Sequence, residues 1–100
     1  MSYPYVLLAI AQEEYDSAIE WYAARSIKAT EALITEIENA LSLICNNPNR
    51  WRSTYKNFRE LGVHKFPYVI IYTFDENINM VIVTAIFHTS RNPIKKYRKR

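Results

Sequence analysis

The side chains of this protein that could do chemistry are cationic and aromatic, and nearly all of them follow Asn49. Such side chains can supply the base, the acid and the charge-stabilising cation that a metal-free ribonuclease needs. Aromatic rings can also hold nucleic-acid bases by stacking. One group, on or between the expected strands, is Lys56, Arg59 and Lys65; the other, at or after the end of the last strand, is His88, Arg91, Lys95, Lys96, Tyr97, Arg98, Lys99 and Arg100.

Each of these residues also has a structural interpretation. His88, a residue type that exchanges protons near neutral pH, can cap the end of a strand, and Arg91 can pair with a helix carboxylate. The terminal KKYRKR sequence can be a solvated tail. The gathering of these residues at one end of a sheet is what favours a functional role.

Other kinds of site lack sequence support. The sequence has no His/Cys/Asp/Glu cluster at metal-ligand spacing, no glycine-rich phosphate loop and no nucleophile elbow. We therefore expect no metal and no other cofactor.

Composition indicates one globular domain over residues 1–100. Hydrophobic residues make up 49% of the sequence and aromatic residues 14%, which excludes a disordered chain. The single cysteine, Cys45, can form no internal disulfide and falls in an apolar helical pattern, so we expect a core residue in a reducing compartment. No apolar run reaches the about 18–20 residues of a membrane span, and the N-terminus lacks the basic segment of a signal peptide. These features predict a cytoplasmic protein without a membrane partner.

The charges are distributed unevenly. Residues 1–50 carry three Lys/Arg against seven Asp/Glu, a balance of −4, whereas residues 51–100 carry ten against three, a balance of +7. A basic second half suggests an anionic partner, either nucleic acid or an acidic protein segment. The alternative is a solvated basic face.

The first half of the sequence predicts a strand and a helical hairpin. Residues 3–11 are aromatic and β-branched, which indicates a strand, and the acidic residues at 13–16 favour the first turn of a helix that runs to about Ala24. Ser26 is a suitable N-cap for a second helix, which the Asn-Asn-Pro sequence at 46–48 ends. The apolar stripe of this helix is Ile27, Thr30, Leu33, Ile34, Ile37, Ala40, Leu41, Leu43 and Ile44.

The second half predicts three antiparallel strands. Residues 55–63 form a strand of mixed polarity, Gly62 marks a turn or bulge, and residues 66–74 and 78–87 are two strands around the turn at 75–77. The first of these two strands has one face made of Phe66, Tyr68, Ile70, Tyr72 and Phe74, and an opposite face made of Val69 and Ile71. The second has one face made of Ile78, Met80, Ile82 and Ile86, and an opposite face made of Val81, Val83, Ala85 and Phe87. Both faces of this hairpin are therefore apolar, and two helices can cover only one face of the sheet. The other is therefore expected to bind a partner, unless the chain ends or a second copy cover it.

Several strings of the sequence resemble the RelE/ParE family of toxins from bacterial type II toxin–antitoxin modules. They are Phe66-Pro67-Tyr68-Val69-Ile70-Ile71-Tyr72, His88-Thr89-Ser90-Arg91-Asn92-Pro93, Ala18-Ile19-Glu20-Trp21-Tyr22 and Asn47-Pro48. The resemblance implies an α+β fold: an N-terminal strand, a helical hairpin and an antiparallel three-stranded meander in one sheet, with the helices on one face. It also implies a cognate antitoxin whose tail wraps the toxin, with a toxin–antitoxin heterotetramer as one assembly.

The family has two functional branches. One branch cleaves mRNA in the ribosomal A site, and the other poisons DNA gyrase. The ribonuclease branch uses two basic residues on the second strand, an arginine in the third strand, and an arginine and a tyrosine after the last strand. By position, Lys56, Arg91 and Tyr97 match the ribonuclease set, but Phe58 and Val69 stand where basic residues would be. The FPY and H-x-SR-x-P strings favour the ParE-like branch.

These arguments predict a growth-inhibiting toxin with a ParE-like action on gyrase. The alternatives are a ribosome-dependent mRNA endonuclease and a non-toxic antitoxin-binding protein. The residues expected to be catalytic in a nuclease are His88, Arg91, Tyr97 and Lys56; those expected to bind the target are Arg59, Lys65, Lys95, Lys96 and Arg98; those expected to bind the antitoxin are Phe66, Tyr68, Tyr72, Val81 and Val83.

Overall fold

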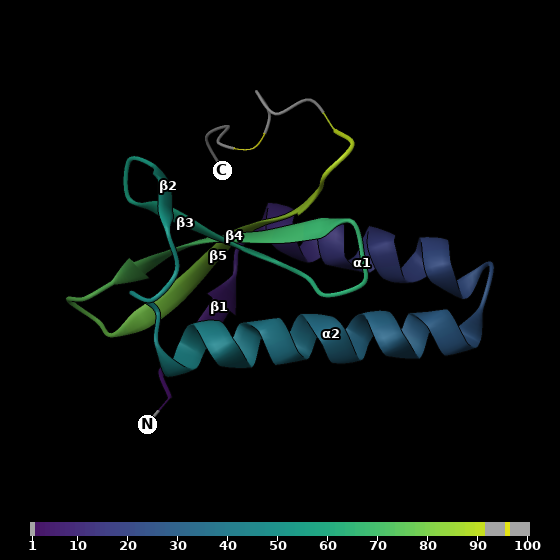
Figure 1. Cartoon of the computed structure of the whole chain (residues 1–100), viewed down its shortest axis with the longest axis horizontal. Helices are drawn as coiled ribbons and strands as arrows, with labels where there is room; N and C mark the ends of the chain where they lie inside the picture. The colour runs from purple at the N-terminus through teal and green to yellow at the C-terminus, as the bar shows by residue number, and fades with distance from the viewer. Residues whose placement is uncertain (1, 92–95, 97–100) are drawn as a thin grey trace.

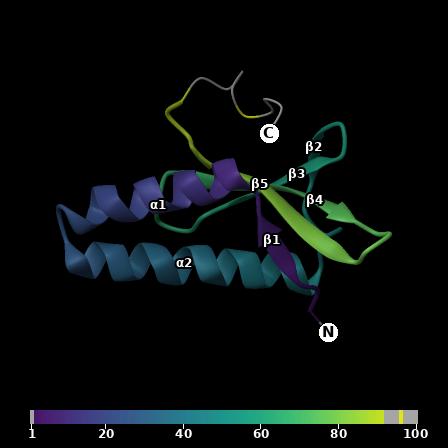
Figure 2. The same cartoon turned by 180° about the vertical axis from the view of Figure 1, so that it is seen from behind.

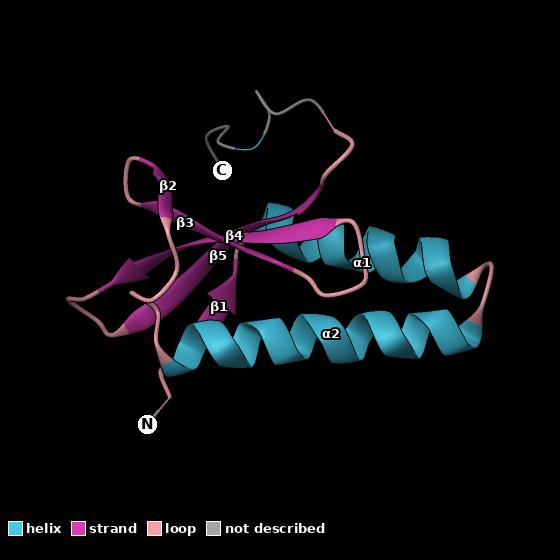
Figure 3. Cartoon of the chain, viewed as in Figure 1, coloured by secondary structure: helices cyan, strands magenta, loops and turns pink. Residues whose placement is uncertain are grey.

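The computed structural model has two layers, a five-stranded sheet and a helical hairpin that covers one of its faces (Figures 1 and 3). The structure describes residues 2–91 and residue 96. The elements are β1 (Tyr5–Leu7), α1 (Ala9–Ala23), α2 (Ile27–Asn46), β2 (Ser53–Tyr55), β3 (Phe58–Gly62), β4 (Tyr68–Asp75) and β5 (Met80–His88). The strand order is β1-β5-β4-β3-β2, with β1 parallel to β5 and the other pairs antiparallel. The predicted α+β fold with both helices on one face is confirmed. Among the described residues, no helix is long and apolar enough to cross a membrane.

The two helices run antiparallel and side by side, as the reverse view in Figure 2 also shows. The predicted cap of α2 is confirmed, because the Ser26 hydroxyl accepts a hydrogen bond from the Ala29 N–H at 3.1 Å. The middle of the predicted stripe packs in the core, with Leu33, Ile37 and Ile44 fully buried. Ile27 is 75% exposed, since it starts the helix at the tip of the hairpin, beyond the end of the sheet.

The first strand is shorter than predicted. β1 pairs with β5 over three residues, and the N–H of Leu8 then donates to the carbonyl oxygen of Val83 at 3.0 Å. The Leu8 carbonyl accepts from the N–H of Gln12, so α1 begins at Ala9 and the acidic residues at 13–16 lie past its first turn. A short apolar run such as residues 9–11 fits a strand and a buried helix turn equally well, which is why the boundary was misplaced.

The strand predicted over residues 55–63 is confirmed as β3, but its first residues, 55–57, are not part of β3. The chain instead makes a short hairpin, in which Tyr55 pairs with Phe58 around Lys56 and Asn57. Lys56 adopts φ 50°, a left-handed conformation that is uncommon for a residue other than glycine. Gly62 ends β3 at an ordinary φ, and Lys65 takes the left-handed position in the next turn, with φ 70°. Neither turn carries the glycine signal that sequence reasoning relies on.

A β-bulge at Thr84 reverses the faces of the last strand. Tyr72 pairs with Val83 but Ile71 pairs with Ala85, so Thr84 is an extra residue in β5. Its buried hydroxyl donates to the carbonyl oxygen of Ile71 at 3.2 Å. Before the bulge Val81 and Val83 face the helices; after it, Ile86 does so and Ala85 and Phe87 turn away. The predicted alternation, which set Ile86 opposite Val81 and Val83, is therefore wrong beyond Thr84.

The core beneath the helices contains a buried tyrosine with a raised pKa. The Tyr72 hydroxyl donates to the carbonyl oxygen of Pro48 at 2.6 Å, which fastens the loop after α2 to the sheet. Burial raises the pKa of Tyr72 to about 12, against an opposing effect of the nearby Arg59 charge. The unfolded chain, with a tyrosine pKa of about 10, loses this proton first.

We therefore expect the free energy of unfolding to fall as pH rises from about 10 to about 12, with Tyr72 contributing about 2–3 kcal/mol of that fall. Tyr72→Phe should make the fall shallower by that amount. At neutral pH the same change should cost about 1–3 kcal/mol, because the Pro48 carbonyl loses its donor. Chemical denaturation at neutral pH and at several alkaline values measures both effects. An unchanged alkaline slope in Tyr72→Phe would contradict the assignment.

Candidate functional site

A single carboxylate joins α1, the last strand and the segment after it. Glu14 Oε1 accepts a hydrogen bond from the Ile86 N–H at 2.9 Å, and Glu14 Oε2 lies 3.2 Å from Arg91 Nη1. The Glu14 side chain is 12% exposed and the Arg91 side chain 45%. The predicted alternative in which Arg91 pairs with a helix carboxylate is thus confirmed.

The Thr84 bulge explains why Glu14 is needed there. Before the bulge, β5 bonds to the β1 side through the N–H of Val81 and the carbonyl of Val83. The extra residue turns the N–H of Ile86 to that same side, where β1 has already ended. Because a buried N–H without an acceptor costs free energy, a side-chain oxygen has to take the place of the missing strand.

His88 lies on the helix-facing side of the sheet end, opposite to its neighbour Phe87. Its Nδ1 accepts from the Ser90 N–H at 3.1 Å and lies 2.7 Å from Ser90 Oγ, and its ring meets Tyr68 edge-on with centroids 5.1 Å apart. A backbone N–H can only donate, so Nδ1 is the acceptor and a neutral ring carries its proton on Nε2. His88 therefore caps the end of the strand, as its structural interpretation predicted.

A groove runs between α1 and the ends of β4 and β5. It has two hollows, of about 240 Å³ and about 400 Å³, which share Ser17, Tyr68 and His88. The first is also lined by Glu13, Glu14, Ile86 and Arg91, and the second by Trp21, Tyr22 and Pro67. Burial raises the pKa of Tyr68, with Tyr22 adding to the effect, so its phenol is protonated at neutral pH. We name this feature the α1 groove.

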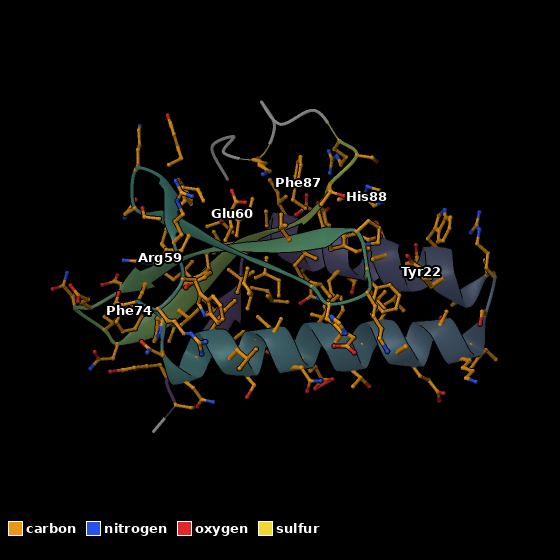
Figure 4. All side chains as sticks on the ribbon, viewed as in Figure 1. Tyr22, Arg59, Glu60, Phe74, Phe87 and His88 are labelled. Carbon is orange, nitrogen blue, oxygen red and sulfur yellow. The ribbon has the colours of Figure 1, made fainter. Side chains whose placement is uncertain are left out.

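The sheet face away from the helices is covered. Ile71, Ala85 and Phe87 are buried there, with Phe58 and Val69 packed against them. The Arg91 guanidinium and the Lys96 ammonium lie over the Phe87 ring at 5.6 and 5.9 Å, and Lys96 also pairs with Glu60 at 3.3 Å. Figure 4 shows Glu60 and Phe87 together on this side of the sheet. The open apolar face expected from the sequence is absent from the described part of the chain.

The structure separates several of the other predicted site residues. Lys56 lies in the β2–β3 turn, with its ammonium 5.4 Å from the Tyr55 ring, and does not line the α1 groove. Arg59 has a structural role, since its Nη1 donates to the carbonyl oxygens of Trp51 and Asn49. Lys65 is exposed in the turn before β4. Lys95, Tyr97 and Arg98 lie outside the described residues.

The residues predicted to bind an antitoxin are core residues. Tyr72, Val81 and Val83 are fully buried beneath the helices, Tyr68 is buried, and Phe66 packs against the same core. In this structure they point toward the helical hairpin, whereas the prediction placed the antitoxin contacts on an open face of the sheet. Binding of an antitoxin to these residues stays a prediction.

Sequence reasoning missed Glu14 and Ser90 as partners of Arg91 and His88. Four polar residues, Gln12, Glu13, Glu14 and Asp16, lie within five positions of α1. Only the direction of the helix relative to β5 decides which carboxylate faces inward, and no local signal gives that direction. The exposed Trp21, which lines the groove, was noted as part of a string without a role.

Comparison with known proteins gives consistent results. The family model for the ParE toxin of the type II toxin–antitoxin system parDE matches residues 5–93. A search of curated protein sequences finds no match. Among solved structures, the chromosomal ParDE toxin–antitoxin system from P. aeruginosa is similar with a TM-score of 0.73 and 11% identity over 87% of this chain and 96% of the other. The toxin–antitoxin complex RelBE2 from Mycobacterium tuberculosis is similar with a TM-score of 0.58 and 14% identity, over 88% of this chain and 99% of the other.

Proposed function

Because the chain belongs to the ParE toxin family of type II toxin–antitoxin systems, we propose that it stops bacterial growth by binding DNA gyrase and not by cleaving RNA. The proposal rests on the chemistry of the sheet face away from the helices. A metal-free ribonuclease needs an acid, a base and a cation around one phosphate. The two strand positions at which the ribonuclease branch would carry basic residues hold Phe58 and Val69, and both pack against the apolar cluster of Ile71, Ala85 and Phe87.

The polar groups around that apolar cluster support the same conclusion. The described residues over the Phe87 ring are Arg91 and Lys96, which are cations, and Lys96 is paired with Glu60. His88 alternates with Phe87 along β5 and caps the strand on the other face. The described residues of this face offer charge for binding an acidic surface, and no neutral base and acid converge on one point among them.

An antitoxin is the second proposed partner. The two similar structures are toxin–antitoxin complexes, which is the basis for proposing a cognate antitoxin for this chain. Large apolar side chains are exposed at the N-terminal strand and on α1, where a partner could bury them: Tyr3, Tyr5, Val6 and Trp21. We propose these exposed side chains as the antitoxin contacts, in place of the buried core residues predicted from the sequence.

Two reactions in vitro separate the functional branches. The purified chain is added to gyrase with relaxed plasmid DNA, and in parallel to ribosomes translating a defined mRNA. We expect loss of supercoiling in the first and intact message in the second, with Arg91→Ala weaker in the first. Cleaved message with unaffected gyrase would instead establish the nuclease. No effect in either reaction, with antitoxin binding retained, would indicate a non-toxic binding protein.

A further inference from the structure

We infer that Glu14 is a positioning residue, which holds the Arg91 guanidinium in the orientation in which it meets an acidic group of the target. The inference rests on the proposed function and adds a residue on α1 to it. The geometry around Arg91 carries the argument.

Arg91 is fixed on several sides. Its Nη1 lies 3.2 Å from Glu14 Oε2, its guanidinium carbon is 5.6 Å from the centre of the Phe87 ring, and its backbone N–H donates to the His88 carbonyl oxygen at 3.1 Å. A guanidinium has five N–H donors, and the contact with Glu14 uses one nitrogen. With the side chain 45% exposed, part of it stays accessible to solvent while Glu14 holds Nη1. Bidentate binding of a carboxylate or phosphate uses two parallel N–H donors of one guanidinium.

Glu14 is itself held in place. Its other oxygen accepts the Ile86 N–H at 2.9 Å, and the side chain is mostly buried. A lone surface ion pair is a weak restraint, because both side chains move freely. Here one partner is tied to the β5 backbone, so the other is positioned relative to the sheet. The Thr84 bulge, which turns that N–H toward α1, is thus linked to the orientation of Arg91.

The test uses Glu14→Gln, whose amide oxygen can still accept the Ile86 N–H but which lacks the charge. Glu20→Gln is the matched control, because Glu20 is an exposed carboxylate on the same helix that does not line the α1 groove, and the charge change is the same. Arg91→Ala and the double variant Glu14→Gln/Arg91→Ala complete a cycle. Growth inhibition is titrated with inducer at equal amounts of protein, the unfolding midpoint is measured for each variant, and NMR relaxation reports the order of the Arg91 Nε–H.

We expect Glu14→Gln to weaken growth inhibition about tenfold or more and to lower the order of the Arg91 side chain, with the protein still folded and Glu20→Gln unchanged. The double variant should be no weaker than Arg91→Ala alone. Full inhibition by Glu14→Gln when Arg91→Ala is impaired, or an unchanged order of the Arg91 Nε–H, would overturn the inference. A wild-type chain that does not inhibit growth would contradict the proposed function, whereas the NMR measurement needs no target and still decides whether Glu14 positions Arg91.

Discussion

Insertion of one alanine between Ala85 and Ile86 is expected to abolish the folded state, although it adds a single residue. The insertion would move Phe87 to the side of the helices and turn Ile86 to the opposite face, because strand side chains alternate. The bulky Phe87 ring would enter a core already filled, and the N–H of Ile86 would turn away from Glu14. Overpacking and lost hydrogen bonds each cost about 1–3 kcal/mol, which together approaches the whole stability of a small domain.

A substitution at the bulge itself is the control. Thr84→Ala keeps the extra residue and loses only the hydrogen bond to the Ile71 carbonyl, so about 1 kcal/mol of destabilisation is expected. Circular dichroism and chemical denaturation distinguish the two variants. An insertion variant as stable as Thr84→Ala would show that the register after the bulge does not decide which side chains of β5 enter the core.

Ile37→Ala and Ile27→Ala are expected to differ sharply. Both residues belong to the apolar stripe predicted for α2, but Ile37 is fully buried in the core and Ile27 is 75% exposed. Removing a buried isoleucine loses its transfer free energy and leaves a cavity, so Ile37→Ala should cost about 2–5 kcal/mol. Ile27→Ala should stay within about 0.5 kcal/mol of the wild type, since alanine also has the higher helix propensity.

Urea denaturation of the two variants measures this difference directly. Similar losses for both would mean that Ile27 is covered by a part of the chain or by a second copy that the described residues do not include. The pair therefore also tests whether the tip of the helical hairpin is open to a partner.

The parts of the fold that were predicted correctly depend on repeated local signals. The apolar stripe of α2, its Ser26 cap and its end before Pro48 agree with one another, and each rests on well-understood helix chemistry. The runs that became β4 and β5 were also recognisable from their apolar residues and the polar turn between them. Their general arrangement followed from having two helices and one sheet.

The errors arose where a single residue changes a pattern. Thr84 shifts the alternation of β5 without any glycine or proline to mark it, and Lys56 turns the chain in a conformation that its residue type seldom adopts. The residues predicted to bind an antitoxin all precede the Thr84 bulge, and they point toward the helical hairpin because the orientation of the sheet relative to the helices has no local signal. The sequence predicted that Arg91 could pair with a helix carboxylate. Identifying that carboxylate as Glu14 requires the direction of α1 relative to β5.

The most direct test of the proposed action is pulse labelling of DNA, RNA and protein synthesis in bacteria after the chain is induced alone, with Arg91→Ala alongside. Gyrase poisoning predicts that DNA synthesis falls first, together with DNA-damage signalling, and that Arg91→Ala delays or removes the effect. An immediate fall in protein synthesis, with cleaved messages and no early change in DNA synthesis, would contradict it.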